Sequence, residues 1–377
     1  MAFPARRFFS VDKILRLLLF VVMVILFLIA IKLFGVSVKA FGKDAASSLF
    51  EGLQNPFAGL AVGILSTVLV QSSSVTTSTV VAMVGAGALP LQYAVPVVMG
   101  ANVGTSITNT LVSLGHVRQS DEFQRAFAGA TVHDFFNLLC VLLFFPLELA
   151  TGLLRHSAEW IVSRFPAQSV GGNWKSPISG TVKYCAGLIE SFFHDVLGMS
   201  GKPLACVLLV VALVMVVVSL ILITRNMRIL MADRIEVLLN RILQRSGLLG
   251  LVIGMVVTML VQSSSITTSL LVPMFGAGVL TLEAGFPIML GANIGTTITA
   301  MLAAAVTGPT GLTIAVVHLL FNVAGTGVFF PFKTMRRVPI ICSEKLAELA
   351  TTNRIFVLVY IGGVFVIMPL LGILIWK

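Results

Sequence analysis

One eight-residue stretch occurs twice in this chain, each time inside a long apolar region. Gln-Ser-Ser-Ser-Val-Thr-Thr-Ser fills positions 71–78, and Gln-Ser-Ser-Ser-Ile-Thr-Thr-Ser fills positions 262–269, a spacing of 191 residues. The register continues, because 22 of the 38 residues in 71–108 are identical to their counterparts in 262–299. So many hydroxyl groups in hydrocarbon are costly unless they face each other or a ligand. The repeat therefore predicts two copies of one membrane unit, with a substrate site where the copies meet.

The composition restricts the surroundings of this repeat to a membrane. Only 11% of the 377 residues are charged and 57% are apolar, whereas an ordinary soluble domain has roughly 25% charged residues. Residues 52–117 contain no Lys, Arg, Asp or Glu at all, and one span needs only about 20 residues. We therefore predict an all-α integral membrane protein whose uncharged stretches fold back within the bilayer.

Each copy is expected to hold a re-entrant helical hairpin followed by a broken transmembrane helix. Apolar half-helices flank the Gln-Ser-Ser-Ser tips, and the Gly-Ala-Asn-x-Gly-Thr segments that follow carry glycines that would free the backbone to unwind. In the first copy these parts are the half-helix 58–70, the tip, the return helix 75–84 and the helix 92–114, broken at 99–105. In the second copy they are 247–261, the tip, a return helix to 275 and a broken helix at 285–305.

Five segments follow from these boundaries. They are an N-terminal anchor helix with an interfacial linker (1–54), transport repeat 1 (55–150), an inter-repeat region (151–245), transport repeat 2 (246–332), and a basic loop with a C-terminal span (333–377). The inter-repeat region is divided into an exposed loop at 166–203, a span at 204–224 and a basic amphipathic helix at 225–245, expected to lie on the membrane surface.

The net charge of +10 is explained by loop residues that set membrane orientation, and no nucleic-acid partner is expected. With the N-terminus inside, the basic segments 1–16, 115–125, 225–245 and 333–354 all fall inside and 166–203 falls outside. The first hairpin would then enter from outside and the second from inside. The two repeats are thus predicted to have inverted topology, which permits alternating access.

The repeated stretch suits an anion. Serines directly before a half-helix combine hydroxyl donors with free backbone N–H groups and a partial positive charge. The unwound Gly-Ala-Asn segments would expose oxygens to a hard cation such as Na⁺. Residues 52–117 and 246–282 hold no Lys or Arg, so a buried anion there lacks a balancing charge. This pattern favours cation-coupled symport of an anion, whereas close helix packing alone is the structural alternative.

A third repeated element carries an ionisable residue in one copy only. His133 to Asn137 (His-Asp-Phe-Phe-Asn) matches His318 to Asn322 (His-Leu-Leu-Phe-Asn). A carboxylate in the middle of a span is a functional candidate, and Asp134 would bind a further Na⁺ in one half. The alternative is a structural pair between Asp134 and His133.

With these motifs the chain resembles the type II sodium-dependent phosphate cotransporter family over residues 55–148 and 246–332. The resemblance implies symport of inorganic phosphate with Na⁺, inverted repeats and an elevator-type movement of a secondary transporter. Ala128, Ala130 and Asp134 match the electrogenic members, which implies transport of divalent phosphate with excess Na⁺ charge. Short loops and tails suggest a bacterial inner-membrane protein. The oligomeric state stays open, with a homodimer as one alternative.

The resemblance also implies roles for particular residues. Phosphate contacts are carried over to Ser72, Ser73, Ser74, Ser263, Ser264 and Ser265. Sodium contacts are carried over to Gln71, Gln262, Asn102, Asn293, Thr105, Thr296, Asp134 and Asn137. No catalytic residue, no transition-metal site and no cofactor other than Na⁺ as coupling ion are expected.

Three other functions remain open on the sequence alone. The first is a Na⁺-coupled symporter of sulfate or a dicarboxylate. The second is a membrane-embedded hydrolase that uses a tip serine with His133 as base and Asp134 as the orienting acid, although a catalytic triad need not be duplicated. The third is an anion channel, whose flux would ignore a sodium gradient.

Overall fold

The computed structural model describes residues 11–41, 55–164, 177–242 and 247–375, and every regular element within them is helical. The first half comprises α1 (Val11–Phe41), α3 (Pro56–Val70), α4 (Ser73–Gly85), α5 (Leu91–Thr105), α6 (Ile107–Ser113), a short 3₁₀ turn η2 (Leu114–His116), α7 (Ser120–Thr151) and α8 (Leu153–Ser163). The second half comprises α9 (Pro177–Ser191), η3 (Phe192–Val196), α10 (Gly201–Ile242), α11 (Gly247–Val261), α12 (Ser264–Ser269), α13 (Leu271–Gly276), α14 (Leu282–Ala304), α15 (Pro309–Phe329), α16 (Lys333–Thr352), α17 (Ile355–Gly362), η4 (Gly363–Ile367) and α18 (Met368–Ile375).

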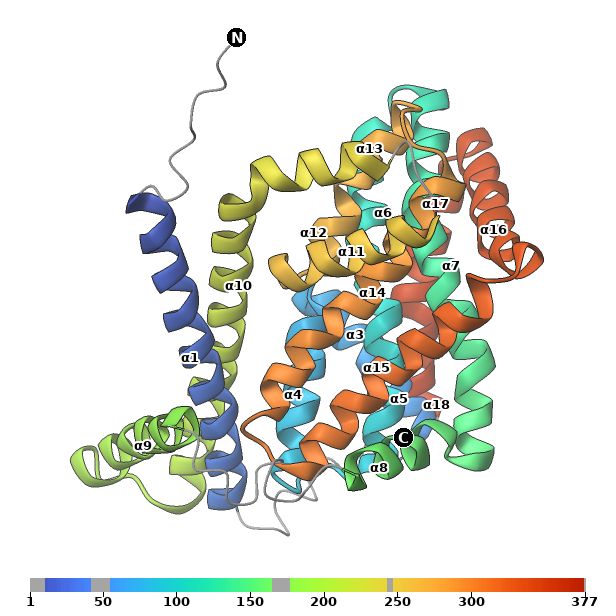
Figure 1. Cartoon of the computed structure of the whole chain (residues 1–377). Coiled ribbons are helices and arrows are strands. Elements are labelled where there is room, and N and C mark those ends of the chain that lie inside the picture. The colour runs from blue at the N-terminus through green and yellow to red at the C-terminus, as the bar shows by residue number, and fades with distance from the viewer. Residues whose placement is uncertain (1–10, 42–54, 165–176, 243–246, 376–377) are drawn as a thin grey trace.

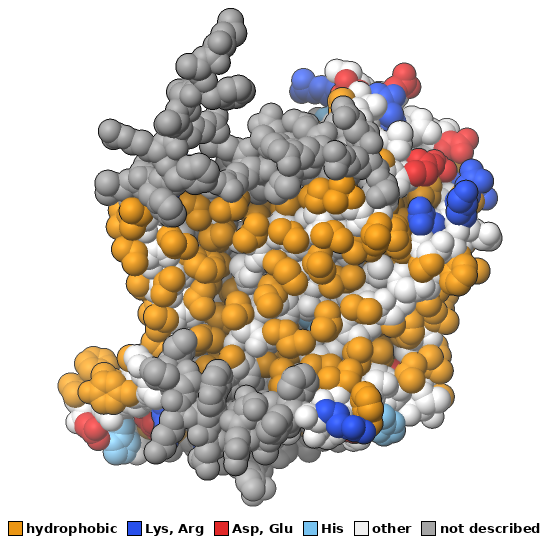
Figure 2. Space-filling view, viewed as in Figure 1, with side chains coloured by type: hydrophobic (Ala, Val, Ile, Leu, Met, Phe, Trp, Pro, Cys, Tyr) orange, Lys and Arg blue, Asp and Glu red, His pale blue; other side chains and the backbone are white. Residues whose placement is uncertain are grey.

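On the face shown in Figure 2, apolar side chains form a broad band, with charged residues above and below it. Six helical segments of the described chain are long and apolar enough to cross a membrane. They are Lys13–Phe41, Ser120–Thr151, Gly201–Met231, Leu282–Ala304, Pro309–Phe329 and Ile355–Ile375. The chain is therefore a multi-pass helical membrane protein, as its composition predicts.

The arms beside the serine tips are shorter than a membrane span. The helices α3 and α11 have 15 residues each and α4 has 13. At about 1.5 Å per residue each covers roughly 20 Å, against a hydrocarbon core of about 30 Å. Each arm ends or begins at a tip inside the molecule, as the predicted half-helices require. The bounds of α11 are those expected from the sequence.

Glycines let each first arm lie directly on the helix that follows its hairpin. A Cβ atom at Gly63 or Gly100 would collide with backbone carbonyl oxygens across the α3–α5 contact. The corresponding residues of the second copy, Gly254 and Gly291, meet carbonyl oxygens across the α11–α14 contact in the same way. Both copies thus use a backbone-to-backbone helix crossing that only glycine permits.

These crossings explain why the prediction of broken helices is largely wrong. In the second copy α14 runs unbroken through the Gly-Ala-Asn segment, from Leu282 to Ala304. In the first copy the same segment is helical to Thr105, and only Ser106 separates α5 from α6. In the second copy the glycines serve close packing rather than unwinding, and in the first copy the helix is interrupted only at Ser106, one residue beyond the predicted break at 99–105.

Three connecting segments also differ from their predictions. Residues 333–352 form the helix α16 instead of a loop, because Ile340, Ala347 and Ala350 bury one face against the protein. Residues 177–191, predicted as loop, form α9. The predicted span at 204–224 and the predicted surface helix at 225–245 form one continuous helix, α10, as far as Ile242, where the described residues pause; its last part turns along the upper face in Figure 1. Of the predicted interfacial linker at 36–55, residues 36–41 belong to α1 and residues 42–54 lie outside the described residues, as does the loop segment 165–176.

The helices α1 and α10 stand side by side at one edge of the molecule, outside the two copies of the repeat (Figure 1). The Asn226 side chain donates a hydrogen bond to the Arg16 carbonyl at 2.8 Å and fixes the two helices in register. The start of α1 and the helix α16 lie at the upper face in Figure 1, whereas α8 and α9 lie at the lower face. The segments expected on one side of the membrane therefore share one face.

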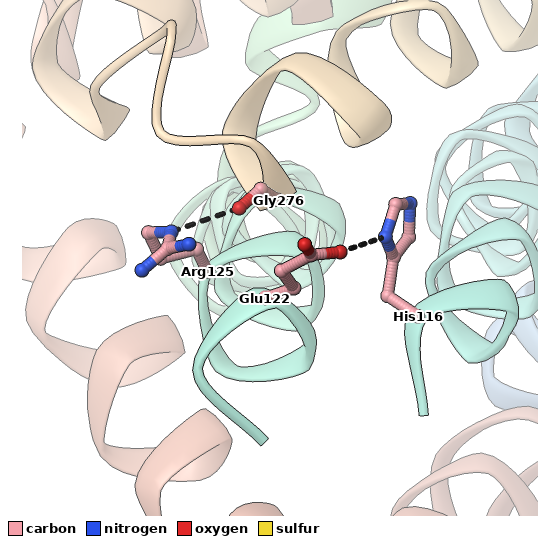
Figure 3. A network of polar contacts seen from close by, with 4 residues as sticks. All are labelled: His116, Glu122, Arg125 and Gly276. Carbon is pink, nitrogen blue, oxygen red and sulfur yellow. Dashed lines mark hydrogen bonds and ion pairs between the residues drawn. The ribbon is translucent and has the colours of Figure 1, made fainter. Parts of the chain in front are cut away.

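Polar contacts fix the second hairpin to the start of α7 at this upper face (Figure 3). The Arg125 side chain donates to the carbonyl of Gly276, the last residue of α13, at 2.9 Å. His116 and Glu122 form an adjacent pair at 3.3 Å. A cation at the carboxyl end of a helix also interacts favourably with the helix dipole.

Candidate functional site

Both serine tips adopt the same strained backbone. Gln71 and Gln262 are the only residues other than glycine with positive φ in the described chain, at 59° and 60°. This left-handed conformation reverses the chain after the first arm. Ser72 and Ser263 then cap the return helices by accepting a hydrogen bond from the backbone N–H three residues on, at 3.4 Å in each copy. Serine is a favoured residue at this capping position.

The glutamine side chains hold each tip to its own copy. The Gln262 amide donates to the Met259 carbonyl at 2.6 Å, and its oxygen accepts from Thr299 at 3.1 Å. The equivalent contacts of Gln71, to the Val68 carbonyl and from Thr108, are both 3.5 Å. The first tip is thus held more loosely than the second, in agreement with its exposed glutamine.

Hydroxyl pairs also clasp the two arms of each hairpin. Thr67 donates to Thr76 at 3.0 Å in the first copy, and Thr258 donates to Thr267 at 2.8 Å in the second. Four of the repeated hydroxyls are therefore used for the shape of the hairpins rather than for a ligand.

The two tips open onto one cavity of about 660 Å³. Serine side chains of both copies line it, namely those of Ser72, Ser74, Ser263 and Ser265. Ser73 and Ser264 are buried first residues of the return helices and do not line the cavity. The first amide groups of α4, those of Ser73 and Ser74, have no partner within the helix, whereas the Val75 amide is capped by Ser72, so this tip offers both hydroxyl and N–H donors.

Hydrogen bonds join the two copies directly beside this cavity. The hydroxyls of Ser74 and Thr296 lie 3.4 Å apart. Thr268 and Ser269 of the second copy both donate to the Asn109 side-chain oxygen of the first, at 2.9 and 3.0 Å. The tips therefore converge, as the duplicated pattern predicts.

A chain of buried amides continues from one copy into the other. The Nε2 of His133 lies 2.7 Å from the Asn293 side-chain oxygen. The Asn293 amide donates to the Asn137 side-chain oxygen at 2.8 Å, and the Asn137 amide donates to the Asn102 carbonyl at 2.9 Å. Thr105 stays in its own helix and donates to the Ala101 carbonyl at 3.2 Å. Of the expected cation-binding residues, Asn102, Asn137 and Asn293 are thus in contact.

Asp134 is completely buried and bonded on one oxygen. Its Oδ2 accepts from the Thr110 hydroxyl at 3.1 Å and from the Tyr360 hydroxyl at 2.8 Å. Its Oδ1 has no hydrogen-bond partner among the described residues. A buried carboxylate oxygen without a donor is costly unless a ligand or a proton meets it.

The structural pairing of Asp134 with His133 is not found, because the Nε2 of His133 contacts Asn293 and its Nδ1 has no partner among the described residues. No described serine is hydrogen-bonded to His133 either. The Ser–His–Asp arrangement that the hydrolase alternative requires is therefore missing from the described part of the chain.

Two cations from outside the repeats line the cavity. Arg225 and Arg228 of α10 face it together with the serines. Residues 52–117 and 246–282 contain no Lys or Arg. The prediction that a bound anion lacks a protein cation nearby is nevertheless wrong for this cavity, because α10 supplies two. A sequence pattern could not reveal this contact, since α10 belongs to neither copy.

The third repeated element is bonded unequally in the two copies. His133 and Asn137 join the amide chain described above. Both ring nitrogens of the corresponding His318 and the side-chain oxygen of Asn322 have no partner among the described residues, although both residues are buried. Identical residues at matching positions of the two copies therefore make different contacts.

Comparison with known proteins identifies the family of the chain. The sequence pattern of the family described as Na⁺/Pi-cotransporter matches residues 26–151 and 215–368, including both tips. The chain belongs to the Na⁺/Pi-cotransporter family. The resemblance expected from the motifs is thus confirmed.

Several relatives carry names that state a transport activity. Sodium-dependent phosphate transport protein 2A of Rattus norvegicus is 32% identical over 385 residues, which are 84% of this chain and 60% of the relative. The 2A protein of Mus musculus is 33% identical with the same coverage, and the 2B protein of Homo sapiens is 32% identical over 84% of this chain and 58% of its own length. The chain thus spans about 60% of the length of these relatives. No solved structure matches it.

Sequence reasoning missed four functional candidates. Asn109 receives two hydroxyl donors from the second tip, Tyr360 holds Asp134, and Arg225 and Arg228 line the cavity. Asn109 has alanine at its counterpart, position 300, and Tyr360 follows both repeats. The departure from the repeat at Asn109 is the one signal in the sequence that could have indicated its role.

Proposed function

We propose that this chain carries inorganic phosphate across the membrane together with Na⁺. The observation that carries the proposal is the single cavity lined by serines of both tips, in a chain whose family is named for Na⁺ and phosphate. A tetrahedral oxyanion needs donors on several sides, and two facing sets of hydroxyls supply them. The family consists of transporters, and the chain itself acts as a transporter and not as an enzyme.

Four of the six tip serines are the proposed direct phosphate contacts, and the other two have a supporting role. Ser72, Ser74, Ser263 and Ser265 act through their hydroxyls, in keeping with their position at the cavity. Ser73 and Ser264, which are buried behind it, support the tips from within.

Na⁺ is the coupling ion, bound by side-chain oxygens beside the cavity. The proposed sodium contacts are those of Gln71, Gln262, Asn102, Asn293, Thr105, Thr296, Asp134 and Asn137. The free Oδ1 of Asp134 supports its part in this set. One carboxylate in one copy makes the transport of divalent phosphate electrogenic, with the charge of Na⁺ exceeding that of the substrate.

The movement proposed is elevator-like, with repeats of inverted topology in a cell membrane, the inner membrane in a bacterium. The hairpins support the inversion, because α4 ends at Gly85 beside Thr307 whereas α13 ends at Gly276 beside Arg125 at the opposite face.

Reconstituted uptake tests the proposal. Purified protein in liposomes should accumulate labelled phosphate under an inward Na⁺ gradient and lose accumulation when K⁺ or choline replaces Na⁺. Stronger competition by sulfate or a dicarboxylate than by unlabelled phosphate would favour the other symporter. Flux that ignores the Na⁺ gradient would favour a channel and overturn the proposal.

Ser265→Ala tests the tips with little structural side effect, because the Ser265 hydroxyl makes no hydrogen bond within the described chain. We expect the apparent affinity for phosphate to fall by about tenfold, since a lost bond to a charged ligand costs roughly 1.5 kcal/mol or more. The control is Ser66→Ala, which removes a half-buried hydroxyl away from the cavity. Equal affinities in the two variants would contradict a role of this serine.

A further inference from the structure

The cavity between the serine tips has a third wall, made by α10. Leu220, Ile221, Thr224, Arg225 and Arg228 of this helix line it. The two arginines are the only charged side chains among the described residues that line it. The cavity is therefore electropositive at α10 and neutral at the tips.

The orientation of α10 directs these arginines toward the tips. The five lining residues recur at 220/221, 224/225 and 228, about one helical turn apart, which places them on one face of the helix. Asn226 lies on another face, is 4% exposed and bonds to the Arg16 carbonyl of α1. This contact with α1 fixes the rotation of α10 about its axis. The positive-inside rule accounts for arginines at this depth of the membrane, but not for the face on which they lie.

We propose that Arg225 and Arg228 form a phosphate-collecting entrance, at which the anion is held before it reaches the serine tips or after it leaves them. The proposal rests on the proposed function of the same cavity. A guanidinium group matches two oxygens of a phosphate with parallel N–H donors. Two such groups about one helical turn apart present two neighbouring positive charges to a dianion.

The arginines of the entrance and the serines of the tips contribute differently to phosphate binding. The arginines are exposed, so their attraction for phosphate is partly screened by salt, with a screening length of about 8 Å at physiological ionic strength. They raise the local concentration of phosphate and speed its encounter with the cavity. The tips contain only neutral hydrogen-bond donors. They therefore bind the desolvated anion less tightly than a buried cation would. The positive charges of Arg225 and Arg228 then favour release of phosphate from the tips toward α10.

The two arginines lie at the level of Arg16, near the start of α1. The entrance therefore serves the face of the membrane at which α1 begins (Figure 1). Phosphate presented from that face meets the arginines first, and phosphate presented from the other face does not.

The test is a comparison of R225Q/R228Q with wild type in vesicles of known orientation. Sodium-driven phosphate flux is measured against phosphate concentration from each face separately, at low and high ionic strength. We expect the KM for phosphate presented from the α1 face to rise by about three- to tenfold at low ionic strength. The maximal flux, the KM from the opposite face and the dependence on Na⁺ should stay unchanged. High salt should bring wild type toward the variant.

The matched control is K333Q/R337Q, which removes two exposed charges of α16 from the same face without touching the cavity. Its KM should equal that of wild type. R225K/R228K keeps the charge but loses the two-pronged geometry, so it should retain the salt dependence with a smaller rise in KM. If R225Q/R228Q fails to insert into the membrane, R225K/R228K still tests the proposal.

A KM in R225Q/R228Q equal to that of wild type would overturn the proposed entrance. If only R225K/R228K inserts, a KM and a salt response both equal to those of wild type would do the same. An equal rise in the α16 control would do the same, since the effect would then be one of overall charge. Failure of the proposed function is a different result, because wild type itself would show no sodium-driven flux.

Discussion

Asp134 shows how one residue can break the equality of two copies. Its counterpart in the second copy is Leu319. Hydroxyls from two different helices, Thr110 of α6 and Tyr360 of α17, hold the same carboxylate oxygen and leave the other oxygen free. The free oxygen is thereby oriented by the fold, and no sequence pattern connects positions 134 and 360. The C-terminal span, which lies outside both repeats, helps to build this position.

Tyr360→Phe measures this contact. The ring is retained between Phe127, Phe135 and Phe365, so only the hydroxyl is lost. In a double-mutant cycle with Asp134→Asn, the coupling in the free energy of unfolding should be about 1.5–3 kcal/mol, the range for a hydrogen bond to a charged group. Denaturant titration of the purified protein measures it. Tyr93→Phe serves as the control, and a coupling within about 0.5 kcal/mol of zero would contradict the contact.

Asp134→Gly tests the proposed electrogenic transport. If the free oxygen binds a Na⁺ that has no counterpart in the second copy, its removal should abolish the transport current and leave sodium-dependent phosphate uptake. Current and uptake are recorded from the same proteoliposomes. Asp195→Gly, at an exposed carboxylate of η3, should change neither. A current that persists in Asp134→Gly would exclude this role.

At the scale of helices, the glycine crossings decide how each copy is assembled. The same two positions, Gly63 with Gly100 and Gly254 with Gly291, bring the first arm of each hairpin against the following long helix. The sequence contains these glycines at matching positions, but it does not reveal whether a glycine permits unwinding or close approach. The hairpin arms and tips were predictable because their apolar runs end at a polar motif. The unbroken course of α14 was not predictable, because it depends on packing across the crossing.

The helix α16 illustrates a second limit of the same kind. Its many charged residues indicated a loop, whereas small and apolar residues recur on one face at positions 339, 340, 343, 347 and 350. This helical periodicity was present in the sequence and was outweighed by composition. Periodicity was the better guide here, because burial of one face is what stabilises a surface helix.

Gly291→Ala tests the crossing. Its Cβ would collide with the Leu251 carbonyl oxygen, and a backbone atom cannot rotate away. We expect a loss of about 1–3 kcal/mol in stability, typical of an overpacked interior, seen as a lower Tm in detergent. Gly327→Ala in α15 has open space around the added methyl group and should keep the Tm of wild type or raise it. Equal Tm values for both variants would contradict the close approach.

At the scale of the whole molecule, the duplicated motif predicted that the two tips converge. It did not predict the third wall of the cavity between them. The duplicated serines indicated that two elements meet, and the structure brings them to one cavity. The third wall comes from α10, which has no copy, so no internal comparison of the sequence could identify it. The sequence alone thus predicts the symmetric part of the site and misses the part outside the repeat.

The distribution of segments between two faces predicts which positions face the outside of the cell. In a chain whose four cysteines are replaced, Tyr184→Cys of α9 should react with a membrane-impermeant thiol reagent on intact cells. Lys345→Cys of α16 should react only after the cells are opened. Both side chains are exposed, so access decides the result. The cysteine-free parent should stay unlabelled, and labelling of both positions on intact cells would refute the orientation.

The backbone contact at the paired glycines has a mechanical consequence. Where two helices touch through their main chains, no side chain can change rotamer to let one slide past the other. The first arm and its long helix therefore form one stiff unit in each half. A displacement within either half would have to use contacts made by side chains, such as those of α4 and α11 with α10, and not these glycine crossings.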